Sequence, residues 1–353
     1  MQNSSLQFLK DLIAARGPSG FEQPVAQVWR NYAANFAQKI DRDLHGNSIA
    51  ELNAEGAPRI MLSGHCDEIG FLVKYIDEKG FIYFSPIGGH DRSLIGGRRV
   101  NIHTENGVVK GVTGKKALHL MSSDEREKGP EPFEKMWIDI GASSREEAME
   151  QISIGDPVTH DLGFQKLTDD VAASRAFDNR AGAFVVAEAL RYLQGEKFTA
   201  SVFSVATVQE EIGLRGATTS AFSINPVVGI GVDVTHATDH PEVDVKKDGE
   251  IKLGKGPVIF RGANANPKVF ALLKKAADEE NIPFQIRSFP RGTGTDANPI
   301  QLARGGVAAG LVSVPLRYMH TPSEVASLRD IDNAAKLLAA FIKRVTSETD
   351  FRP

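Results

Sequence analysis

The sequence predicts an α/β fold in which a mainly parallel sheet is flanked by helices and interrupted by a small inserted β-domain. Apolar, strand-like runs alternate with amphipathic helical segments in both end regions of the chain. Such alternation is typical of parallel sheets covered by helices. From residue 69 to residue 165, short β-type segments and glycine-containing turns replace it. We therefore expect a discontinuous α/β domain of residues 1–68 and 166–353, and a β-domain of residues 69–165.

The expected elements follow in order along the chain. Residues 6–13 and 25–32 have apolar side chains at helical spacing, and Gly17-Pro18-Ser19-Gly20 between them is a turn signal. The first buried strand runs to His65. In the insert, β-type segments cover 71–76, 81–84, 99–103 and 107–112, and only 144–151 has a helical pattern. Later helices are expected at 181–193, 267–280 and 331–345, and apolar strands at 199–208, 227–232 and 310–314.

Composition excludes several classes of protein. At 353 residues the chain is long enough for about two domains of roughly 150 residues each. A net charge of −4 with no basic run argues against a binder of nucleic acid or anionic membranes. The single cysteine, Cys66, excludes an internal disulfide framework and indicates a reducing compartment. No signal peptide is visible in residues 1–20, and no apolar run approaches the ~20 residues of a membrane span. We expect a soluble, cytoplasmic protein.

Metal-ligating residue types follow the ends of predicted strands. In an open α/β sheet, ligands bind beyond the carboxyl ends of the strands. Four such ends carry imidazoles and carboxylates, and one more acid precedes a predicted helix. Together these side chains suffice for two divalent cations. The candidates are His65, Asp178, Glu211, Asp233 and His320.

Each cluster also has a simpler explanation. Glu210-Glu211 alone is more often a solvated pair, but here it ends a buried apolar run. Asp233 alone is a cap or a surface acid, yet an acid at the edge of a core is costly unless paired or metal-bound. His320 alone is as often a packed histidine as a ligand. Asp67, two residues after His65, adds weight because a ligating histidine usually needs a carboxylate or carbonyl on its other nitrogen. The prediction depends on the clusters together.

Five short motifs contain these residues. They are His65-x-Asp67-Glu68-Ile69-Gly70, Phe177-Asp178-Asn179-Arg180, Gln209-Glu210-Glu211-Ile212-Gly213, Gly231-Val232-Asp233 and His320-Thr321-Pro322-Ser323-Glu324. Together they resemble the glutamyl-aminopeptidase or TET-aminopeptidase family of dinuclear metallopeptidases. The resemblance covers almost the whole chain and implies a zinc-exopeptidase-like fold with an insertion between the first two ligand motifs.

The resemblance implies a role for each matched residue. Asp178 would bridge two metal ions and precede a cis peptide bond. His65 and Asp233 would complete one metal site, and Glu211 and His320 the other. The metals would be two divalent ions per subunit, zinc first and cobalt or manganese as alternatives.

The resemblance also implies an activity and an assembly. Glu210 would be the general base, and Asp67 would fix the tautomer of His65. The expected function is removal of N-terminal residues from short peptides. The insert would drive self-association into dimers that assemble into a tetrahedral dodecamer. The exposed strand edges of a small β-domain could support such pairing.

Other functions stay open at this stage. A related dinuclear amidohydrolase, such as a deacylase or carboxypeptidase, would use the same metals and base. A glycosidase would need two acids and no metal. A non-enzymatic assembly protein would not need a complete ligand set together with Glu210.

Several polar residues have no assigned role in this scheme. Cys66 is expected to be a buried structural thiol, and His90 and His119 to pack or to lie on the surface. The loop 291–296 is interpreted as a substrate-pocket loop, with Asp296 as a possible helix cap. His236, Asp239 and His240 are interpreted as a polar loop rather than an accessory metal site.

Overall fold

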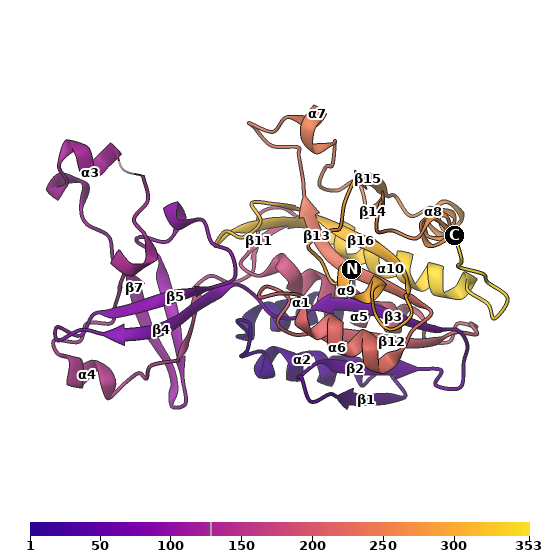
Figure 1. The fold of residues 1–353 in the computed structure, drawn as a ribbon, viewed down its shortest axis with the longest axis horizontal. Coiled ribbons are helices and arrows are strands. Elements are labelled where there is room, and N and C mark those ends of the chain that lie inside the picture. The colour runs from indigo at the N-terminus through magenta and orange to yellow at the C-terminus, as the bar shows by residue number, and fades with distance from the viewer. Residues whose placement is uncertain (128) are drawn as a thin grey trace.

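The structure, a computed structural model, describes residues 1–127 and 129–353. An 11-stranded sheet forms its larger part (Figure 1). The order is β1-β2-β12-β3-β13-β16-β17-β11-β10, and β14 and β15 attach through β16. The strands are β1 Lys39–Arg42, β2 Ser48–Leu52, β3 Arg59–His65, β10 Gln165–Lys166, β11 Val171–Ser174, β12 Ser201–Thr207, β13 Val228–His236, β14 Val258–Gly262, β15 Gln285–Phe289, β16 Ala308–Arg317 and β17 Glu324–Ser327.

This sheet is mixed. Its four central strands, β12, β3, β13 and β16, run parallel. Antiparallel strands flank them: β2 pairs with β12 on one side, and β17 pairs with β16 on the other. The parallel strands are the long apolar runs of the sequence, because a central strand covered on both faces has no polar side.

Helices cover both faces of the sheet. One face carries five helices: α1 Asn3–Ala14, α2 Gln23–Ala33, α5 Phe177–Tyr192, α8 Pro267–Glu279 and α10 Leu328–Arg344. The other carries α6 Arg215–Ile224 and α9 Ala297–Gln301. Successive residues of a strand point to opposite faces. Accordingly Leu62 packs with the α5 and α10 side chains, and its neighbour Met61 packs with α6 and α9.

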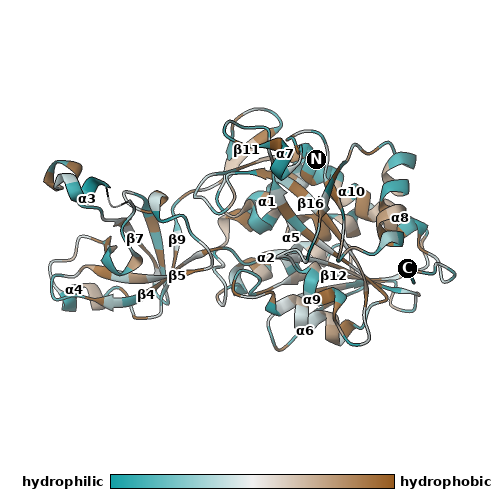
Figure 2. Ribbon diagram, turned by 45° about the horizontal axis from the view of Figure 1, so that its top comes forward, coloured by the Kyte–Doolittle hydropathy of each residue, from teal (hydrophilic) through white to brown (hydrophobic). Residues whose placement is uncertain are grey.

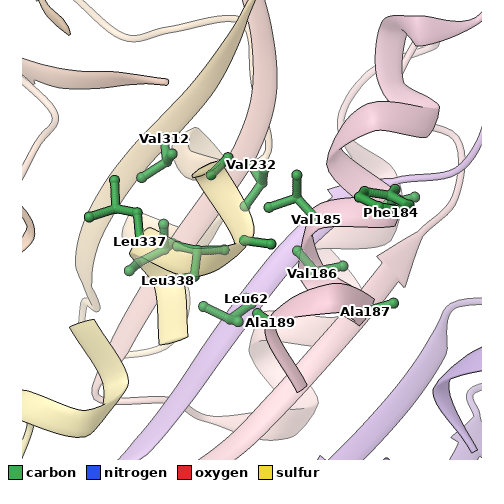
Figure 3. Close-up of a cluster of buried hydrophobic side chains, with 14 of the residues drawn as sticks. Leu62, Phe184, Val185, Val186, Ala187, Ala189, Val232, Val312, Leu337 and Leu338 are labelled. Carbon is green, nitrogen blue, oxygen red and sulfur yellow. The ribbon is translucent and has the colours of Figure 1, made fainter. Parts of the chain in front are cut away.

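The main core lies between the sheet, α5 and α10. Figure 3 shows Val232 and Val312 of the central strands beside Leu337 and Leu338 of α10, with Val185 of α5 opposite. Hydrophobic colouring follows the central strands and the inward helix faces (Figure 2). Burial of this surface is the dominant favourable term in folding.

A closed barrel of six strands forms the smaller part, at the left of Figure 1. Its order is β4-β5-β8-β7-β6-β9, and β9 closes the ring by pairing with both β4 and β6. The expectation of exposed strand edges is therefore wrong for these six strands, because closure pairs every edge. The elements are β4 Gly70–Ile76, β5 Ile82–Ile87, β6 Arg99–Thr104, β7 Gly107–Thr113, β8 Ile138–Asp139 and β9 Pro157–His160, with α3 Ser123–Glu127 and α4 Arg145–Met149.

Helix ends differ from the sequence expectation where capping decides them. The last helix, α10, begins at Leu328 rather than at residue 331, because the Ser327 hydroxyl accepts a hydrogen bond from the Asp330 N–H at 3.2 Å. The expected helix of 144–151 is shorter, and the Ser144 hydroxyl caps it. Helix α3 contradicts the expectation that 144–151 is the only helix of the insert. Helix α6 and the four-residue helix α7, Val245–Asp248, were also not anticipated from the sequence.

A close approach of two glycines positions α5 on the sheet. A Cβ added to Gly64, in β3, would come within 2.5 Å of the Gly182 backbone in α5. Only a residue without a side chain permits this contact. The first residues of α5 thereby lie beside the carboxyl end of β3.

Among the described residues, no helix has both the length and the apolar character needed to cross a membrane.

Candidate active site

His65 is the last residue of β3 and lies in the interior of the protein. Its side chain is 2% exposed, and carboxylates face both of its ring nitrogens. Nδ1 lies 3.3 Å from Asp67 Oδ1, and Nε2 lies 3.4 Å from Asp178 Oδ1. Burial lowers the pKa of His65, but Glu210, Asp178 and Asp67 outweigh burial and raise it well above its usual range.

Asp67 connects His65 to the two tandem glutamates. Its Oδ1 accepts a hydrogen bond from the Glu210 N–H at 3.1 Å, and its Oδ2 accepts one from the Glu211 N–H at 3.2 Å. The Ser19 hydroxyl donates a third at 2.7 Å. Burial raises the pKa of Asp67, but the contacts with His65, Ser19 and the Glu210 amide outweigh it and keep the carboxyl ionised.

Glu210 and Glu211 follow β12, where the chain leaves the sheet. Gln209 adopts a left-handed conformation with φ of 56°, which turns the backbone before the pair. Glu210 Oε2 lies 3.6 Å from His65 Nε2, and Glu211 Oε2 lies 3.4 Å from His320 Nε2. Two neighbouring acids therefore face different histidines, as the end of the strand allows.

Asp178 lies between the two histidines. Its Oδ1 faces His65, and its Oδ2 lies 3.3 Å from His320 Nε2. The peptide bond that follows it, Asp178-Asn179, is cis, as the resemblance led us to expect. The Asn179 side chain donates to the Val232 carbonyl at 2.9 Å and accepts from the Gly182 N–H at 2.8 Å. These bonds tie the start of α5 to β13.

The remaining two candidate ligands, Asp233 and His320, lie in a strand and in a loop. Asp233 lies inside β13, which continues four residues beyond its expected end at residue 232, and its Oδ1 is 3.9 Å from His65 Nε2. His320 lies in the loop between β16 and β17 and has φ of 60°. The five predicted ligands converge. Two groups that could each hold a metal ion share Asp178: His65, Asp178, Asp233 and Asp178, Glu211, His320. A third possible group joins His65 with Glu210 and Glu211.

Electrostatics at this cluster favour a bound cation. Burial, together with Asp233, Asp296 and Asp178, raises the pKa of Glu210 to about 9, against the opposing effect of His65. Burial and neighbouring carboxylates also raise the pKa values of Glu211 and Asp233 well above their usual range. Glu211 Oε1 is buried and has no hydrogen-bond partner in the described part of the chain. Crowded carboxylates with an unsatisfied oxygen are the environment that a divalent cation stabilises.

Three supporting residues were missed by the sequence reasoning. Glu324, buried, accepts hydrogen bonds from the backbone N–H groups of Asp178 and His320, each at 3.0 Å. Glu22 accepts one from the Gln209 N–H at 3.1 Å, which fixes the turn before Glu210. Gly89, in the segment after β5, leaves room for His320: an added Cβ would come within 3.3 Å of Nδ1. Glu324 ends the last quoted motif and Glu22 closely follows the turn signal of residues 17–20, but no spacing rule indicates backbone contacts.

The other polar candidates take structural roles. Cys66 is fully buried in the main core. His90 stacks on Phe71, and its Nε2 lies 2.8 Å from the Gly70 carbonyl; burial lowers the pKa of His90 to about 4. His119 is exposed, and Asp239 pairs with Arg317 at 2.7 Å. The exception is His236: it was expected in a polar loop, but it ends β13 and lines the active-site cavity.

Asp296 does not cap α9 with its side chain, so this expectation is wrong. Instead its buried carboxylate accepts hydrogen bonds from the Ser63 and Thr207 hydroxyls at 2.5 and 2.6 Å. Hydroxyls near the ends of β3 and β12 thus bind Oδ2 of this acid, whereas its buried Oδ1 has no hydrogen-bond partner among the described residues. The preceding residues 293–295 do line the active-site cavity, as expected of a substrate-pocket loop.

A cavity of about 440 Å³ opens over the cluster. The five predicted ligands and Glu210 form its polar end. Residues of β14, β15, β16 and the loop before α9 also line it. A pocket with convergent polar groups at one end and apolar walls at the other is typical of a small-molecule or peptide site.

Comparisons with known proteins agree with this geometry. The family model described as M42 glutamyl aminopeptidase matches residues 46–337. The chain belongs to this M42 family. A lysyl aminopeptidase of Pyrococcus furiosus is 37% identical over 98% of this chain and 99% of its own. A TET aminopeptidase structure from a marine sediment Thaumarchaeota archaeon has a TM-score of 0.93 and 35% identity, over 98% of both chains.

A third M42 relative informs on assembly. The TET1 peptidase of Pyrococcus horikoshii has a TM-score of 0.85 and 32% identity, over 97% of this chain and all of its own, and assembles into a tetrahedron or a large octahedral shell. Family membership and these relatives identify the present chain as a metal-dependent aminopeptidase. This M42 membership decides against the glycosidase, scaffold and other amidohydrolase alternatives.

Proposed function

We propose that this aminopeptidase holds two divalent cations and that Asp178 bridges them. His65 and Asp233 would hold one cation, and Glu211 and His320 the other. The observation that carries the proposal is the orientation of the Asp178 carboxylate, whose two oxygens face two different histidines at 3.4 and 3.3 Å. The unpartnered Glu211 Oε1 supplies a further free ligand atom.

When bound, the cations would lower the pKa of a water molecule and polarise the scissile carbonyl. Imidazole and carboxylate ligands suit zinc, with cobalt and manganese as alternatives.

Glu210 is the general base in this proposal. Its carboxylate reaches the His65 end of the cluster, where it could also join His65 and Glu211 around a metal ion, but the two groups that share Asp178 are complete without it. Glu210 would take a proton from the attacking water and deliver it to the leaving amine. Ionisation of Glu210 requires neighbouring positive charge, because burial and acids otherwise raise its pKa to about 9.

Asp67 is a positioning residue. By facing Nδ1 of His65 it directs Nε2 towards Asp178, and by accepting both glutamate amides it sets the distance between Glu210 and His65.

The test is hydrolysis of aminoacyl-p-nitroanilides, and of their N-acetylated forms, by chelator-stripped protein restored separately with zinc, cobalt or manganese. Metal analysis should find two ions per chain, and cleavage should require both the metal and a free amine. Retention of a single ion at full activity would contradict the dinuclear site, and cleavage of blocked substrates would contradict recognition of the amine.

Homo-oligomerisation through the barrel is the second part of the proposal, with residues 69–165 as an inserted domain and dimers assembling into a tetrahedral dodecamer. Its support is apolar surface: Leu118 and Leu120 are 60% and 72% exposed beside the barrel. Large exposed apolar residues gathered in one place indicate an interaction surface. Replacing both by lysine should yield smaller particles in light scattering. An unchanged particle mass would contradict this role.

Cytoplasmic location stays a prediction, to be tested by cell fractionation.

A further inference from the structure

Arg287 is the one arginine or lysine among the described residues that line the active-site cavity. It lies in β15 and shares the cavity with the five candidate ligands. Phe289, two residues further along β15, lines the same cavity. Positions i and i+2 of a strand face the same side. The edge ribbon β14–β15 therefore presents a cation and an aromatic ring to the substrate space.

The contacts of Arg287 fix its orientation without neutralising its charge. Its Nη1 donates to the Thr235 hydroxyl at 2.8 Å and to the His236 carbonyl at 3.1 Å. Both partners are neutral oxygens. Among the described residues, no carboxylate lies within ion-pair distance of Arg287, although most other buried or half-buried arginines here have one. Nη1 thus fixes the position of the side chain, and among the described residues Nη2 and Nε have no hydrogen-bond partner.

The environment of Arg287 favours a strong interaction with an anion. Burial lowers the pKa of Arg287, and the carboxylate of Asp248, which lies beyond ion-pair distance, opposes this effect only in part. Apolar side chains form the neighbouring wall: Phe260, Phe289, Leu311 and Met319. A half-buried cation without a counter-ion is unfavourable. An arginine in such a place is suited to hold a carboxylate through two parallel hydrogen bonds.

The position of Arg287 limits which carboxylate can reach it. Thr235, its anchor, lies two residues after Asp233 in β13, which is about 7 Å along the strand. Arg287 is therefore within the reach of one amino-acid side chain from the candidate ligands. The C-terminal carboxylate of a dipeptide has the same chemistry and a similar reach, since each extended residue spans about 3.3–3.6 Å.

We propose that Arg287 binds a carboxylate of the substrate and that this group is the side chain of an acidic first residue. This inference depends on the proposed aminopeptidase site, because it places the first residue of a peptide between the metal ligands and β15. It makes Arg287 the residue that selects glutamyl or aspartyl peptides. A substrate whose first residue is glutamine has the same shape as the glutamyl substrate without its charge, so we expect it to be cleaved less efficiently.

The test compares kcat/KM for glutamyl-, glutaminyl-, leucyl- and lysyl-p-nitroanilide with the full-length, metal-restored protein. We expect the wild type to favour glutamyl over glutaminyl substrate by roughly 10- to 100-fold, the range of a charge-assisted hydrogen-bonded pair. In Arg287→Met the ratio should fall to near one. In Arg287→Glu, kcat/KM should be higher for the lysyl substrate than for the glutamyl substrate. Arg287→Lys keeps the positive charge but loses the planar guanidinium group that forms two parallel hydrogen bonds, so it should give an intermediate glutamyl-to-glutaminyl ratio. If Arg287→Met does not fold, the ratio of Arg287→Lys tests the proposal in its place.

A matched control lies on the same ribbon. Arg261 in β14 is exposed and lies over the Phe270 ring, 5.5 Å from its centroid, outside the cavity. Arg261→Met should leave the glutamyl-to-glutaminyl ratio at the wild-type value. A fall as large as in Arg287→Met would mean that general surface charge sets the preference, and would overturn the proposal.

A second substrate pair separates the two possible carboxylates. Leucyl-glycine and leucyl-glycinamide differ only in the terminal charge. A change in their ratio in Arg287→Met, without a change in the anilide ratio, would overturn the assignment to the first side chain. A glutamyl-to-glutaminyl ratio near one in the wild type would also overturn it. Failure of the proposed function is a distinct result: the wild type would then cleave none of the four anilides with any metal.

Discussion

The two histidines of the site differ in how the fold supports them. His65 ends a central strand, is 2% exposed, and has carboxylates at both ring nitrogens. His320 lies in a loop, is 36% exposed, and is held through its backbone by Glu324. We call these the buried half, His65 with Asp233, and the open half, Glu211 with His320. The same ligand chemistry is thus rigid on one side and accessible on the other, and the open half should exchange its metal more readily.

The largest expected effect comes from the acid next to the buried half. Glu210→Gln should lower kcat by roughly 10²–10⁴-fold, because the proton acceptor is lost while the ligands remain. Metal analysis should still find two ions per chain. Glu250→Gln, at an exposed residue paired with Lys252, is the control. Full turnover by Glu210→Gln with both metals bound would show that another group is the base.

Removing each histidine in turn tests directly whether the two halves retain metal differently. His320→Ala should keep one ion per chain, since the buried half loses none of its own ligands. His65→Ala should keep less than one, because it leaves Asp67 and Asp178 as uncompensated buried acids. Elemental analysis after dialysis measures both. Equal retention by the two variants would mean that the halves are equivalent.

The supporting acids give a smaller effect in the same direction. Asp67→Asn should weaken metal binding at the buried half, and Glu324→Gln at the open half, each by roughly 10- to 100-fold, as is typical of residues behind metal ligands. Chelator titration of each variant, followed by the number of ions released, assigns the weakened half. If Asp67→Asn weakened the binding of the ion at the open half instead, the assignment of Asp67 to the buried half would be wrong.

Metal removal should make stability depend on pH. In the metal-free protein the pKa of Glu210 is raised from 4.5 to about 9, so the folded state holds more protons than the unfolded state between these values. Its stabilising contribution is complete below pH 4.5 and is lost as pH rises towards 9. The Tm of metal-free protein should therefore fall from pH 5 to pH 8, and Glu210→Gln should flatten this slope. A Tm that rises over this range would contradict the raised pKa.

The smallest effects come from glycines at the two halves. Gly64→Ala, behind the buried half, should destabilise the fold by about 1–3 kcal/mol, because its Cβ would meet the rigid Gly182 backbone. The Cβ added in Gly89→Ala would meet only the ring of His320, at 3.3 Å, so this substitution should destabilise the fold less. Denaturant unfolding of the metal-loaded variants measures both. A larger loss for Gly89→Ala would show that the open half is the more tightly packed.

Much of the site could be predicted from the sequence because ligands at strand ends are local features. His65, Glu211 and Asp233 each follow an apolar run, and in an α/β sheet such ends meet at one edge. The role of Glu324 could not be predicted, because it acts through the backbone amides of Asp178, 146 residues away, and of His320. Closure of the barrel was also missed, since it depends on β9 pairing with two strands distant in sequence.

The sequence by itself determined the alternation of strands and helices, the interruption between residues 69 and 165, and the set of candidate ligands, because periodicity and residue chemistry are properties of short segments. Only the tertiary structure decided which ligand faces which, how deeply each histidine is buried, and that Arg287 enters the cavity without a counter-ion. Those properties arise from distances between segments far apart in the chain, and burial and charge act through such distances.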